Sequence, residues 1–322
     1  MDEHTAAVRS IRTIGENDYI SAGSDGRIIR WQNDVPKEIG KESEIIRTIA
    51  VDKNRETFAT ASESGKISVY TASGDSLISE WVGHSGAAID VEFIGSNQIV
   101  SVGVDSLVYV WDIKSGNKQK LDNQGEQIRN LTVSVNEGLV VGGCNSGNLI
   151  LWDMKNNYSS SKNSPGISNP ITSICFNSKG DRLAVGDMSG MIRILDAGSD
   201  FSILYTEVGH TARVTEINYS RDDKFMATAG LDGTVRLFLT DNYDLAPIVM
   251  NDHIDWVWTV SFSDDGKTVY SGSMNSVIQK FPTDTEQLAE LMCPLLTRNM
   301  SKTEWDKYVA PDIPFEKTCD KK

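Results

Sequence analysis

The 322-residue sequence has no long apolar run, and this bounds where it can act. No stretch reaches the roughly 18 consecutive apolar residues that a membrane-spanning helix needs. The first residues are charged, whereas a secretion signal would begin with an apolar core. We therefore expect a cytoplasmic protein with no membrane partner.

Cysteine is scarce, and its spacing excludes two classes of site. The four cysteines lie far apart and none forms a CxxC pair, so they fit neither a disulfide framework nor a zinc site. We expect buried or incidental thiols, because free cysteine packs as a small apolar residue. They are Cys144, Cys175, Cys293 and Cys319.

Positive charge is also in deficit. There are 31 basic and 45 acidic residues, which gives a net charge of −14. A surface of this sign repels phosphate backbones unless a local basic patch overrides it. The sequence therefore predicts no nucleic-acid partner.

A short pattern fills most of the chain: a small residue, a turn, and an apolar run that ends in a large apolar residue. It returns seven times, with end points 39, 41, 41, 43, 43 and 43 residues apart. An alternating segment and a second short strand precede each copy, so every unit is expected to be an antiparallel sheet of three or four strands. Such sheets bury their faces by stacking radially. The end points are Trp31, Tyr70, Trp111, Trp152, Leu195, Phe238 and Phe281.

The fold class predicted is therefore all-β, a seven-bladed β-propeller over residues 1–281. Outer strands are expected at 76–82 and 201–208. The polar stretch 155–168, KNNYSSSKNSPGIS, is instead expected to be a flexible loop.

The units resemble WD repeats. Gly83-His84 opens one copy, Trp111-Asp112 and Trp152-Asp153 close others, and the resemblance covers residues 4 to 281. In that family a His, a Ser or Thr, an Asp and a Trp form a structural hydrogen-bonded set, and four copies here have matching spacing. The sets are His4, Ser21, Asp25 and Trp31; His84, Ser101, Asp105 and Trp111; His210, Thr228 and Asp232, with Phe238 last; and His253, Ser271 and Asn275, with Phe281 last.

The second, fourth and fifth units lack the His and the Asp, and have Ser64, Ser146 and Ser189 at the turn. We expect apolar packing, more than a polar network, to hold these blades.

The histidine count argues against catalysis. All four histidines occupy the first position of a structural set, so none is left for a general base or a metal ligand. The sequence has no phosphate-binding loop and no nucleophile elbow. We expect no enzyme activity, no metal site and no cofactor. The alternative is a propeller enzyme that acts on a small substrate in the central channel through convergent acids or a metal.

Counting from the start of each repeat picks out residues expected at one mouth of the channel. Arginine, tryptophan and methionine are frequent among them, although the chain is acidic, and the first two are common at binding hot spots. Because blade seven adjoins blade one, Arg9, Arg47 and the two tryptophans should form one arc that receives an acidic protein segment. The alternative is that the arginines pair with local carboxylates and Trp258 packs against neighbouring strands. The candidate partner-binding residues are Arg9, Arg47, Arg129, Arg213, Trp256, Trp258, Met188, Leu231 and Met274.

Residues 282–322 form a second segment. Thr283 to Glu286 and Ser301 to Glu304 match the capping box, so we expect a C-terminal tail of two short helices packed on the propeller. This tail resembles the C-terminus of bacterial WD-repeat proteins that carry a signalling NTPase or caspase-like domain upstream. The resemblance implies the C-terminal part of a larger bacterial signalling protein whose effector domain is missing from this chain.

Together these patterns predict a noncatalytic scaffold or sensor domain that takes part in signal transduction by binding a protein or peptide at the channel mouth. A third reading, a scaffold within a nucleic-acid-handling complex, is disfavoured by the net charge.

Overall fold

The computed structural model describes residues 3–74, 76–283, 298–308, 314, 315, 317 and 319. The chain divides into two compact units, residues 1–280 and 281–322, and each is described here by itself. Among the described residues, no helix is long and apolar enough to span a membrane.

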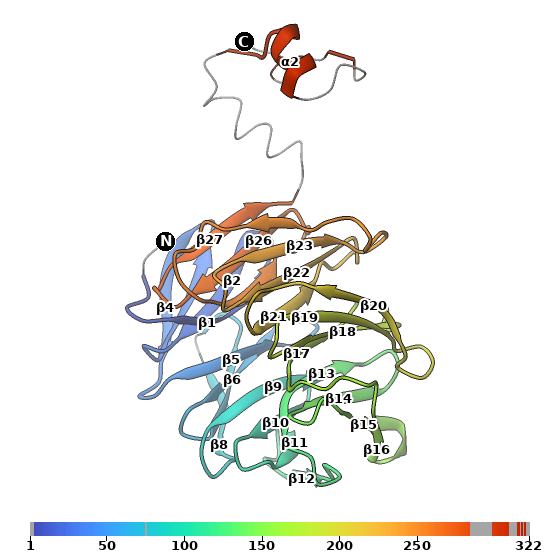
Figure 1. Cartoon of the computed structure of the whole chain (residues 1–322). Helices are drawn as coiled ribbons and strands as arrows, with labels where there is room; N and C mark the ends of the chain where they lie inside the picture. The colour runs from blue at the N-terminus through green and yellow to red at the C-terminus, as the bar shows by residue number, and fades with distance from the viewer. Residues whose placement is uncertain are drawn as a thin grey trace. The chain divides into compact units, whose positions relative to one another are not determined.

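The first unit consists of seven antiparallel sheets, the blades of a propeller (Figure 1). Blade 1 contains β1 (Val8–Gly15), β2 (Asp18–Gly23), β3 (Arg27–Gln32) and β4 (Val35–Lys41). Blade 2 contains β5 (Ile46–Val51), β6 (Thr57–Ser62), β7 (Lys66–Thr71) and β8 (Leu77–Val82). Blade 3 contains β9 (Ala88–Ile94), β10 (Gln98–Gly103), β11 (Val108–Asp112) and β12 (Lys118–Leu121). Blade 4 contains β13 (Ile128–Ser134), β14 (Leu139–Cys144), β15 (Leu149–Asp153) and β16 (Ser159–Asn163). Blade 5 contains β17 (Ile171–Phe176), β18 (Arg182–Asp187), β19 (Met191–Asp196) and β20 (Ile203–Val208). Blade 6 contains β21 (Val214–Tyr219), β22 (Phe225–Gly230), β23 (Val235–Leu239) and β24 (Ile248–Met250). Blade 7 contains β25 (Val257–Phe262), β26 (Thr268–Ser273) and β27 (Ile278–Pro282) among the described residues. The all-β, seven-bladed prediction is confirmed.

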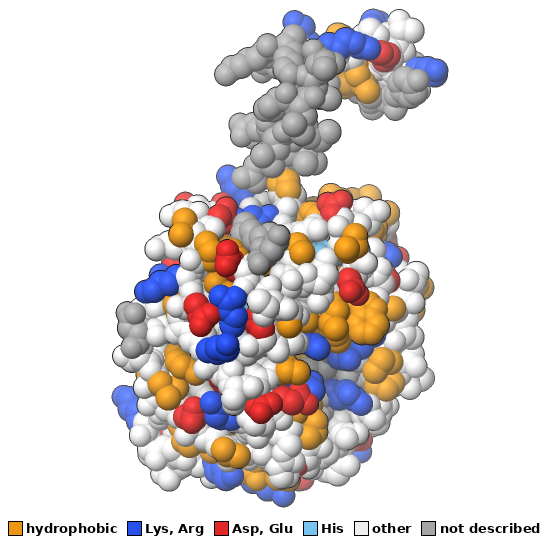
Figure 2. Space-filling view, turned by 90° about the vertical axis from the view of Figure 1, so that its left-hand side faces the viewer, with side chains coloured by type: hydrophobic (Ala, Val, Ile, Leu, Met, Phe, Trp, Pro, Cys, Tyr) orange, Lys and Arg blue, Asp and Glu red, His pale blue; other side chains and the backbone are white. Residues whose placement is uncertain are grey.

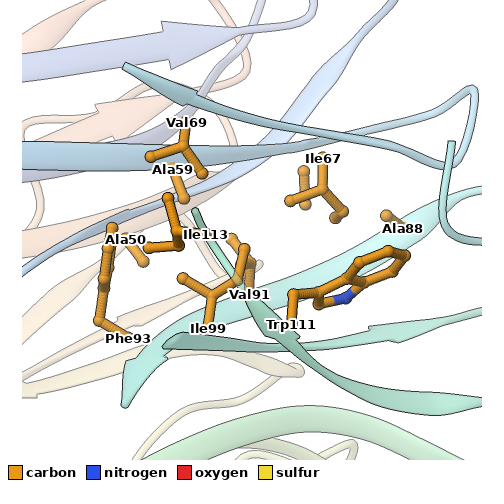
Figure 3. Packing of buried hydrophobic residues seen from close by; sticks show 11 residues of the cluster. Ala50, Ala59, Ile67, Val69, Ala88, Val91, Phe93, Ile99, Trp111 and Ile113 are labelled. Atoms are coloured by element: carbon orange, nitrogen blue, oxygen red, sulfur yellow. The ribbon is translucent and has the colours of Figure 1, made fainter. Parts of the chain in front are cut away.

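The apolar core lies in layers between neighbouring blades. One layer joins blades 2 and 3, where Ile67 of β7 lies in one buried cluster with Val91 of β9 and Trp111 of β11 (Figure 3). Second strands such as β2 are buried along their whole length, because a neighbouring blade covers each face of the sheet. This explains why small residues such as Ala22 are frequent in them.

A chain of polar side chains also links the blades around the channel. In β25 the hydroxyl of Thr259 accepts a hydrogen bond of 3.0 Å from the backbone amide of Ile11 in β1, and so joins the last blade to the first. Four other inner strands bind the next blade through a residue at the same position, which the sequence analysis did not single out. These residues are Ser10, Asp90, Ser173 and Glu216, and they accept from the amides of Ile49, Leu131, Ile217 and Val260.

The expected loop at 155–168 is wrong in part. A short 3-10 helix, η1 (Met154–Asn156), leads into β16, which pairs with β15 along its whole length. Its sequence, SSSKN, has little strand propensity, but the exposed edge of β15 supplies the pairing.

In the second unit the described helix is α2 (Lys302–Tyr308). The capping box forms as expected: Ser301 N donates to Glu304 Oε2 at 2.8 Å, and Glu304 N donates to Ser301 Oγ at 3.3 Å. The helix predicted after Thr283 lies outside the described residues. That the tail packs on the propeller stays a prediction.

The cysteines behave in two ways. Cys144 and Cys175 are free thiols, and burial raises the pKa of each to about 12. Cys319 is disulfide-bonded, so the expectation of thiols alone is wrong for this residue.

Candidate functional site

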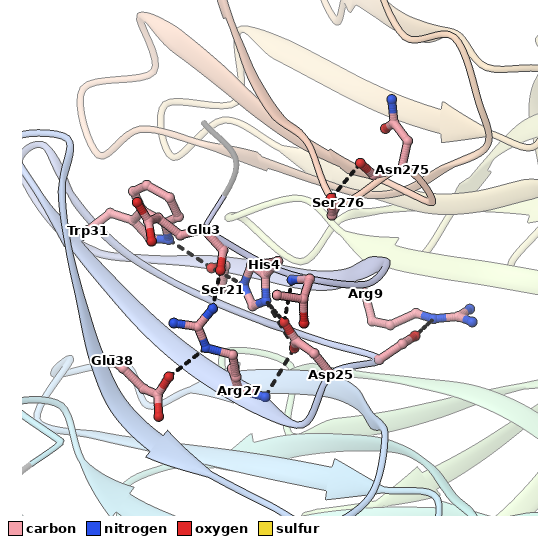
Figure 4. Close-up of polar contacts among 12 residues, drawn as sticks. Glu3, His4, Arg9, Ser21, Asp25, Arg27, Trp31, Glu38, Asn275 and Ser276 are labelled. Atoms are coloured by element: carbon pink, nitrogen blue, oxygen red, sulfur yellow. Dashed lines mark hydrogen bonds and ion pairs between the residues drawn. The ribbon is translucent and has the colours of Figure 1, made fainter.

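The polar sets lie where the sequence spacing placed them. In blade 1, His4 Nδ1 lies 3.0 Å from Asp25 Oδ2, and its Nε2 lies 2.8 Å from Ser21 Oγ, which also accepts from Trp31 Nε1 at 2.8 Å (Figure 4). Burial opposes ionisation of Asp25, but hydrogen bonds from His4 and the amide of Thr5 outweigh it and lower the pKa of Asp25 to about 2. The set therefore ties the loop before β1 to the turn after β2.

Blade 3 repeats this arrangement, and the last two sets are its variants. The side chain of His84 contacts Asp105 at 3.0 Å and Ser101 at 2.9 Å, and Trp111 Nε1 donates to the same serine. In blades 6 and 7 a phenylalanine replaces the tryptophan. The remaining contacts are His210 with Asp232 at 2.9 Å and Thr228 at 2.8 Å, His253 with Ser271 at 2.6 Å, and Asn275 with Ser273.

Blades 2, 4 and 5 have polar networks of their own beside their apolar layers. Each uses a carboxylate from a different position. Glu42 accepts from Thr60 Oγ1 at 2.8 Å, and Asp187 pairs with Arg193 at 2.7 Å. In blade 4, Glu126 accepts from Lys162, and also from Ser146 at 2.7 Å and Asn148 at 2.9 Å. The first two of these contacts are the main reasons that the pKa of Glu126 falls to about 2.

A β-bulge near the start of each inner strand shapes the channel. In β1 the register passes from Val8 opposite Gly23 to Ser10 opposite Ala22, which leaves Arg9 without a cross-strand partner. Bulges redirect side chains, and all seven bulged residues line one central cavity of about 680 Å³. They are Arg9, Arg47, Ile89, Arg129, Thr172, Thr215 and Trp258.

We call the end of the cavity at these bulges the channel mouth; its residues are Arg9, Arg47, Arg129, Arg213, Trp256 and Trp258. Three of the arginines bind the turn of their own blade. Arg9 Nε donates to Ser24 Oγ at 2.9 Å, Arg47 pairs with Glu63 at 2.5 Å, and Arg129 Nε donates to Asn145 Oδ1 at 2.8 Å. Pairing with a local carboxylate, the alternative raised by the sequence, thus holds for Arg47.

Aromatic rings form one side of the mouth. The guanidinium of Arg9 lies 4.0 Å from the centre of the Trp258 ring, and Trp256 meets Trp258 edge to face with ring centres 6.1 Å apart. The arc predicted across blades 7, 1 and 2 is therefore present in space. Figure 2 shows blue and orange side chains gathered around a hollow in the face turned toward the viewer.

Apolar side chains surround the mouth. Met188, Met274 and Trp256 expose 40%, 41% and 47% of their surface, whereas Leu231 is half-buried. Sequence reasoning missed Ile254, which exposes 89% of its surface two residues before Trp256. It directly follows His253, at a position that the count of mouth residues did not include.

The arginines at the mouth repel one another. Burial lowers the pKa of Arg213, and the charges of Arg129, Arg47 and Arg9 lower it further. Burial also lowers the pKa of Arg9, with Arg47 adding to the effect. The mouth therefore concentrates positive charge in an acidic protein.

The middle of the channel is acidic. Arg12 Nη2 pairs with Glu216 Oε1 at 2.7 Å, and both lie in the cavity wall with Asp90 and Glu92. Burial raises the pKa of Asp90 to about 7 and, together with the charge of Asp90, that of Glu92 to about 8. Asp90 and Glu216 also accept backbone amides of the next blade, so both hold blades together.

At the far end of the channel, which lies after the inner strands, the arginines are paired. Asp264 Oδ1 accepts from Arg55 at 2.6 Å and from Arg221 at 2.7 Å, and these bonds lower its pKa to about 2. Within the described part of the chain, no group of three or more His, Cys, Asp or Glu side chains is arranged to hold a metal ion.

Comparison with known proteins agrees with the repeat geometry. The family model "WD domain, G-beta repeat" matches residues 160–196, 201–238 and 247–280. The chain is a β-propeller that contains WD repeats. WD-repeat propellers are in general noncatalytic scaffolds that bind other proteins.

A curated relative of this WD-repeat chain is the "U5 small nuclear ribonucleoprotein 40 kDa protein" of Dictyostelium discoideum. The two are 27% identical over 134 residues, which is 40% of this chain. The match spans only 36% of the relative's own length.

Proposed function

We propose that this WD-repeat domain is a noncatalytic interaction module that binds an acidic segment of a partner protein at the channel mouth. The observation that carries the proposal is the convergence of Arg9, Arg47, Arg129 and Arg213 on one cavity. The carboxylate paired with them is that of Glu63, which leaves positive charge for a ligand. Guanidinium groups bind carboxylates in a planar, two-bonded geometry.

The aromatic and apolar rim supplies contact area next to this charge. Trp256 and Ile254 are exposed, and tryptophan and arginine dominate binding energy in protein interfaces. In this proposal the domain is the partner-binding half of a larger cytoplasmic signalling protein, and its effector domain acts when the mouth is occupied.

Affinity capture from a lysate of the source cell tests the proposal. The wild type is compared with a variant that carries Arg47→Glu and Trp258→Ala, and with a control that carries Arg221→Glu at the far end of the channel. We expect the wild type and the control to retain the same protein and the mouth variant to lose it, with equal melting temperatures. Equal retention by all three proteins would move the site to another surface.

The named relative supports a second candidate, a scaffold within an RNA–protein assembly. Its printed name places that protein in a ribonucleoprotein, and the arginines of the mouth could contact RNA phosphates. Salt-sensitive binding of RNA by the isolated chain, lost on Arg47→Glu, would favour this candidate over the first.

A further inference from the structure

The outer strands of the blades differ in how their free edges are protected. The outermost strand of a sheet leaves main-chain N–H and C=O groups unpaired, and proteins commonly shield such an edge with lysine, proline or a very short strand. Strands β4, β12 and β16 each contain lysine, and β24 has only three residues. The outer strands β8 and β20 have six residues each and contain neither lysine nor proline (Figure 1). These two strands therefore present edges with which another strand can pair.

Both of these strands expose large apolar side chains. In β20, Ile203, Leu204 and Val208 expose 38%, 51% and 64% of their surface, and β8 has the same sequence of exposed and half-buried positions. A β-bulge at Leu204 interrupts the pairing of β20 with β19, so the regular edge of β20 runs over Tyr205–Val208. This segment is long enough for several main-chain hydrogen bonds to an added strand.

The charges next to the two strands differ. In β8 the carboxylate of Glu80 pairs with Lys66 at 3.0 Å. In β20 the carboxylate of Glu207 accepts a hydrogen bond of 2.9 Å from the phenol of Tyr205, and no cation of the described residues pairs with it. Burial raises the pKa of Tyr205 to about 12, and the hydrogen bond to Glu207 and the charges of Glu207 and Asp244 add to this rise. The edge at β20 therefore carries uncompensated negative charge, whereas the edge at β8 does not.

We propose that the edge of β20 binds, as an added strand, an extended segment of a partner protein in which apolar and basic residues alternate. Main-chain hydrogen bonds along Tyr205–Val208 supply affinity, and the side chains supply selectivity. Successive side chains of a strand point to opposite faces, so an apolar residue of the partner lies beside Val208 and a basic residue lies beside Glu207. Residues 203–208 do not line the central cavity, so this inference is independent of the proposed function.

Fluorescence anisotropy with the full chain tests the inference. The probe is a short labelled peptide in which valine and lysine alternate, and its control is the matched peptide of valine and glutamate. Val208→Lys is compared with Val82→Lys, the same change at the last residue of β8, and both positions are exposed, so both variants should melt like the wild type. We expect Val208→Lys to weaken binding of the probe at least about fivefold and Val82→Lys to leave it unchanged. The glutamate peptide should also bind at least about fivefold more weakly than the probe.

Hydrogen exchange distinguishes an added strand from contact through side chains alone. The probe should slow exchange of the amides in β20 and leave those in β8 unchanged. Binding without slower exchange in β20 would overturn the added strand.

The remaining outcomes overturn other parts of the inference. Weaker binding by Val82→Lys, with or without an effect of Val208→Lys, would place the probe at β8 or at no particular edge. Equal binding of the two peptides would overturn the charge preference, and no binding of the probe at about 1 mM would overturn the site. Dimers in analytical ultracentrifugation that Val208→Lys abolishes would replace the partner by a second copy of this chain.

Discussion

The two ends of the channel hold arginines in different surroundings. At the far end, Arg55 and Arg221 share the carboxylate of Asp264, with distances of 2.6 and 2.7 Å. At the mouth, Arg213 has three other arginines as its charged neighbours, and its Nε has no acceptor among the described residues. The far end thus holds arginines that share one carboxylate, whereas the mouth holds an arginine whose charged neighbours are other cations.

This contrast separates residues that stabilise the fold from residues that are kept for a ligand. Paired charges lower the free energy of the folded protein, whereas clustered like charges raise it, and binding sites commonly carry such a stability cost. The far end is therefore expected to respond to mutation through stability, and the mouth through binding.

Replacing Arg12, the arginine in the middle of the channel, should have the largest effect on stability. Arg12→Leu leaves Glu216 without its ion-pair partner, with Asp90 and Glu92 in the same wall. Breaking a buried ion pair from one side costs about 3–5 kcal/mol, so the free energy of unfolding should fall by that order in urea denaturation at pH 7. Arg221→Leu, whose side chain is largely exposed, is the control and should cost far less. If Arg12→Leu lost as little stability as Arg221→Leu, the carboxyl groups in the middle of the channel would not need a counter-charge.

The acidic groups in the middle of the channel should also make the protein less stable at alkaline pH. The pKa of Glu92, raised to about 8 in the folded protein, exceeds the value of about 4.3 expected in the unfolded chain. Between about pH 4 and pH 8, Glu92 is therefore protonated in the folded state and ionised in the unfolded state. The resulting contribution to stability is complete below about pH 4 and is lost as pH rises through about 8. Glu92→Gln should remove this loss and be more stable than the wild type at pH 9, by more than about 1.4 kcal/mol, the equivalent of one pKa unit.

Melting temperatures of the wild type and Glu92→Gln between pH 6 and pH 9 check this prediction. The two curves should diverge as pH rises, with the variant above. If the two melting temperatures changed in parallel with pH, ionisation of Glu92 in the channel would cost no stability. The middle of the channel would then not differ electrostatically from its two ends.

Replacing one arginine at each end should change stability in opposite directions. Arg213→Met removes a repelled cation from the mouth and should raise the free energy of unfolding by about 1 kcal/mol. Arg55→Met removes a paired cation from the far end and should lower it by about 1 kcal/mol or less. Denaturant unfolding of both variants at low salt gives the comparison directly. A loss of stability in Arg213→Met as large as that in Arg55→Met would contradict the distinction between the ends.

The sequence predicted the parts of this molecule whose residues recur at fixed spacing. The blades and the sets around His4 and His84 follow from one period, because each set binds within its own blade. Counting from the start of each repeat also reached Arg9, Arg47 and Trp258, although the bulge that turns these residues into the channel has no composition signal of its own.

The rest depended on contacts that no local pattern encodes. Arg12 and Glu216 meet across blades that are about two hundred residues apart in sequence, and Arg55 meets Asp264 in the same way. Glu42 lies 18 residues before Thr60, as His210 lies 18 residues before Thr228, so it occupies the histidine position, but the search for histidine did not recognise a carboxylate there. Strand β16 forms because β15 offers it an edge, against its own propensity.

The smallest effect is expected from the carboxylate of the far end. Hydrogen bonds from Arg55 and then Arg221, which outweigh the opposing effect of burial, lower the pKa of Asp264 to about 2, against about 3.9 in an unfolded chain. Its contribution to stability is therefore present above about pH 4 and is lost as pH falls toward 2. Asp264→Asn should cost about 1 kcal/mol or less at pH 7, because water reaches these ion pairs, and the cost should shrink in high salt and below pH 4. Urea denaturation of the wild type and Asp264→Asn at pH 7 and pH 3 measures it. If the stability cost of Asp264→Asn stayed constant with pH and salt, Asp264 would stabilise the protein through packing. Its ion pairs with Arg55 and Arg221 would then not explain the difference between the far end and the mouth.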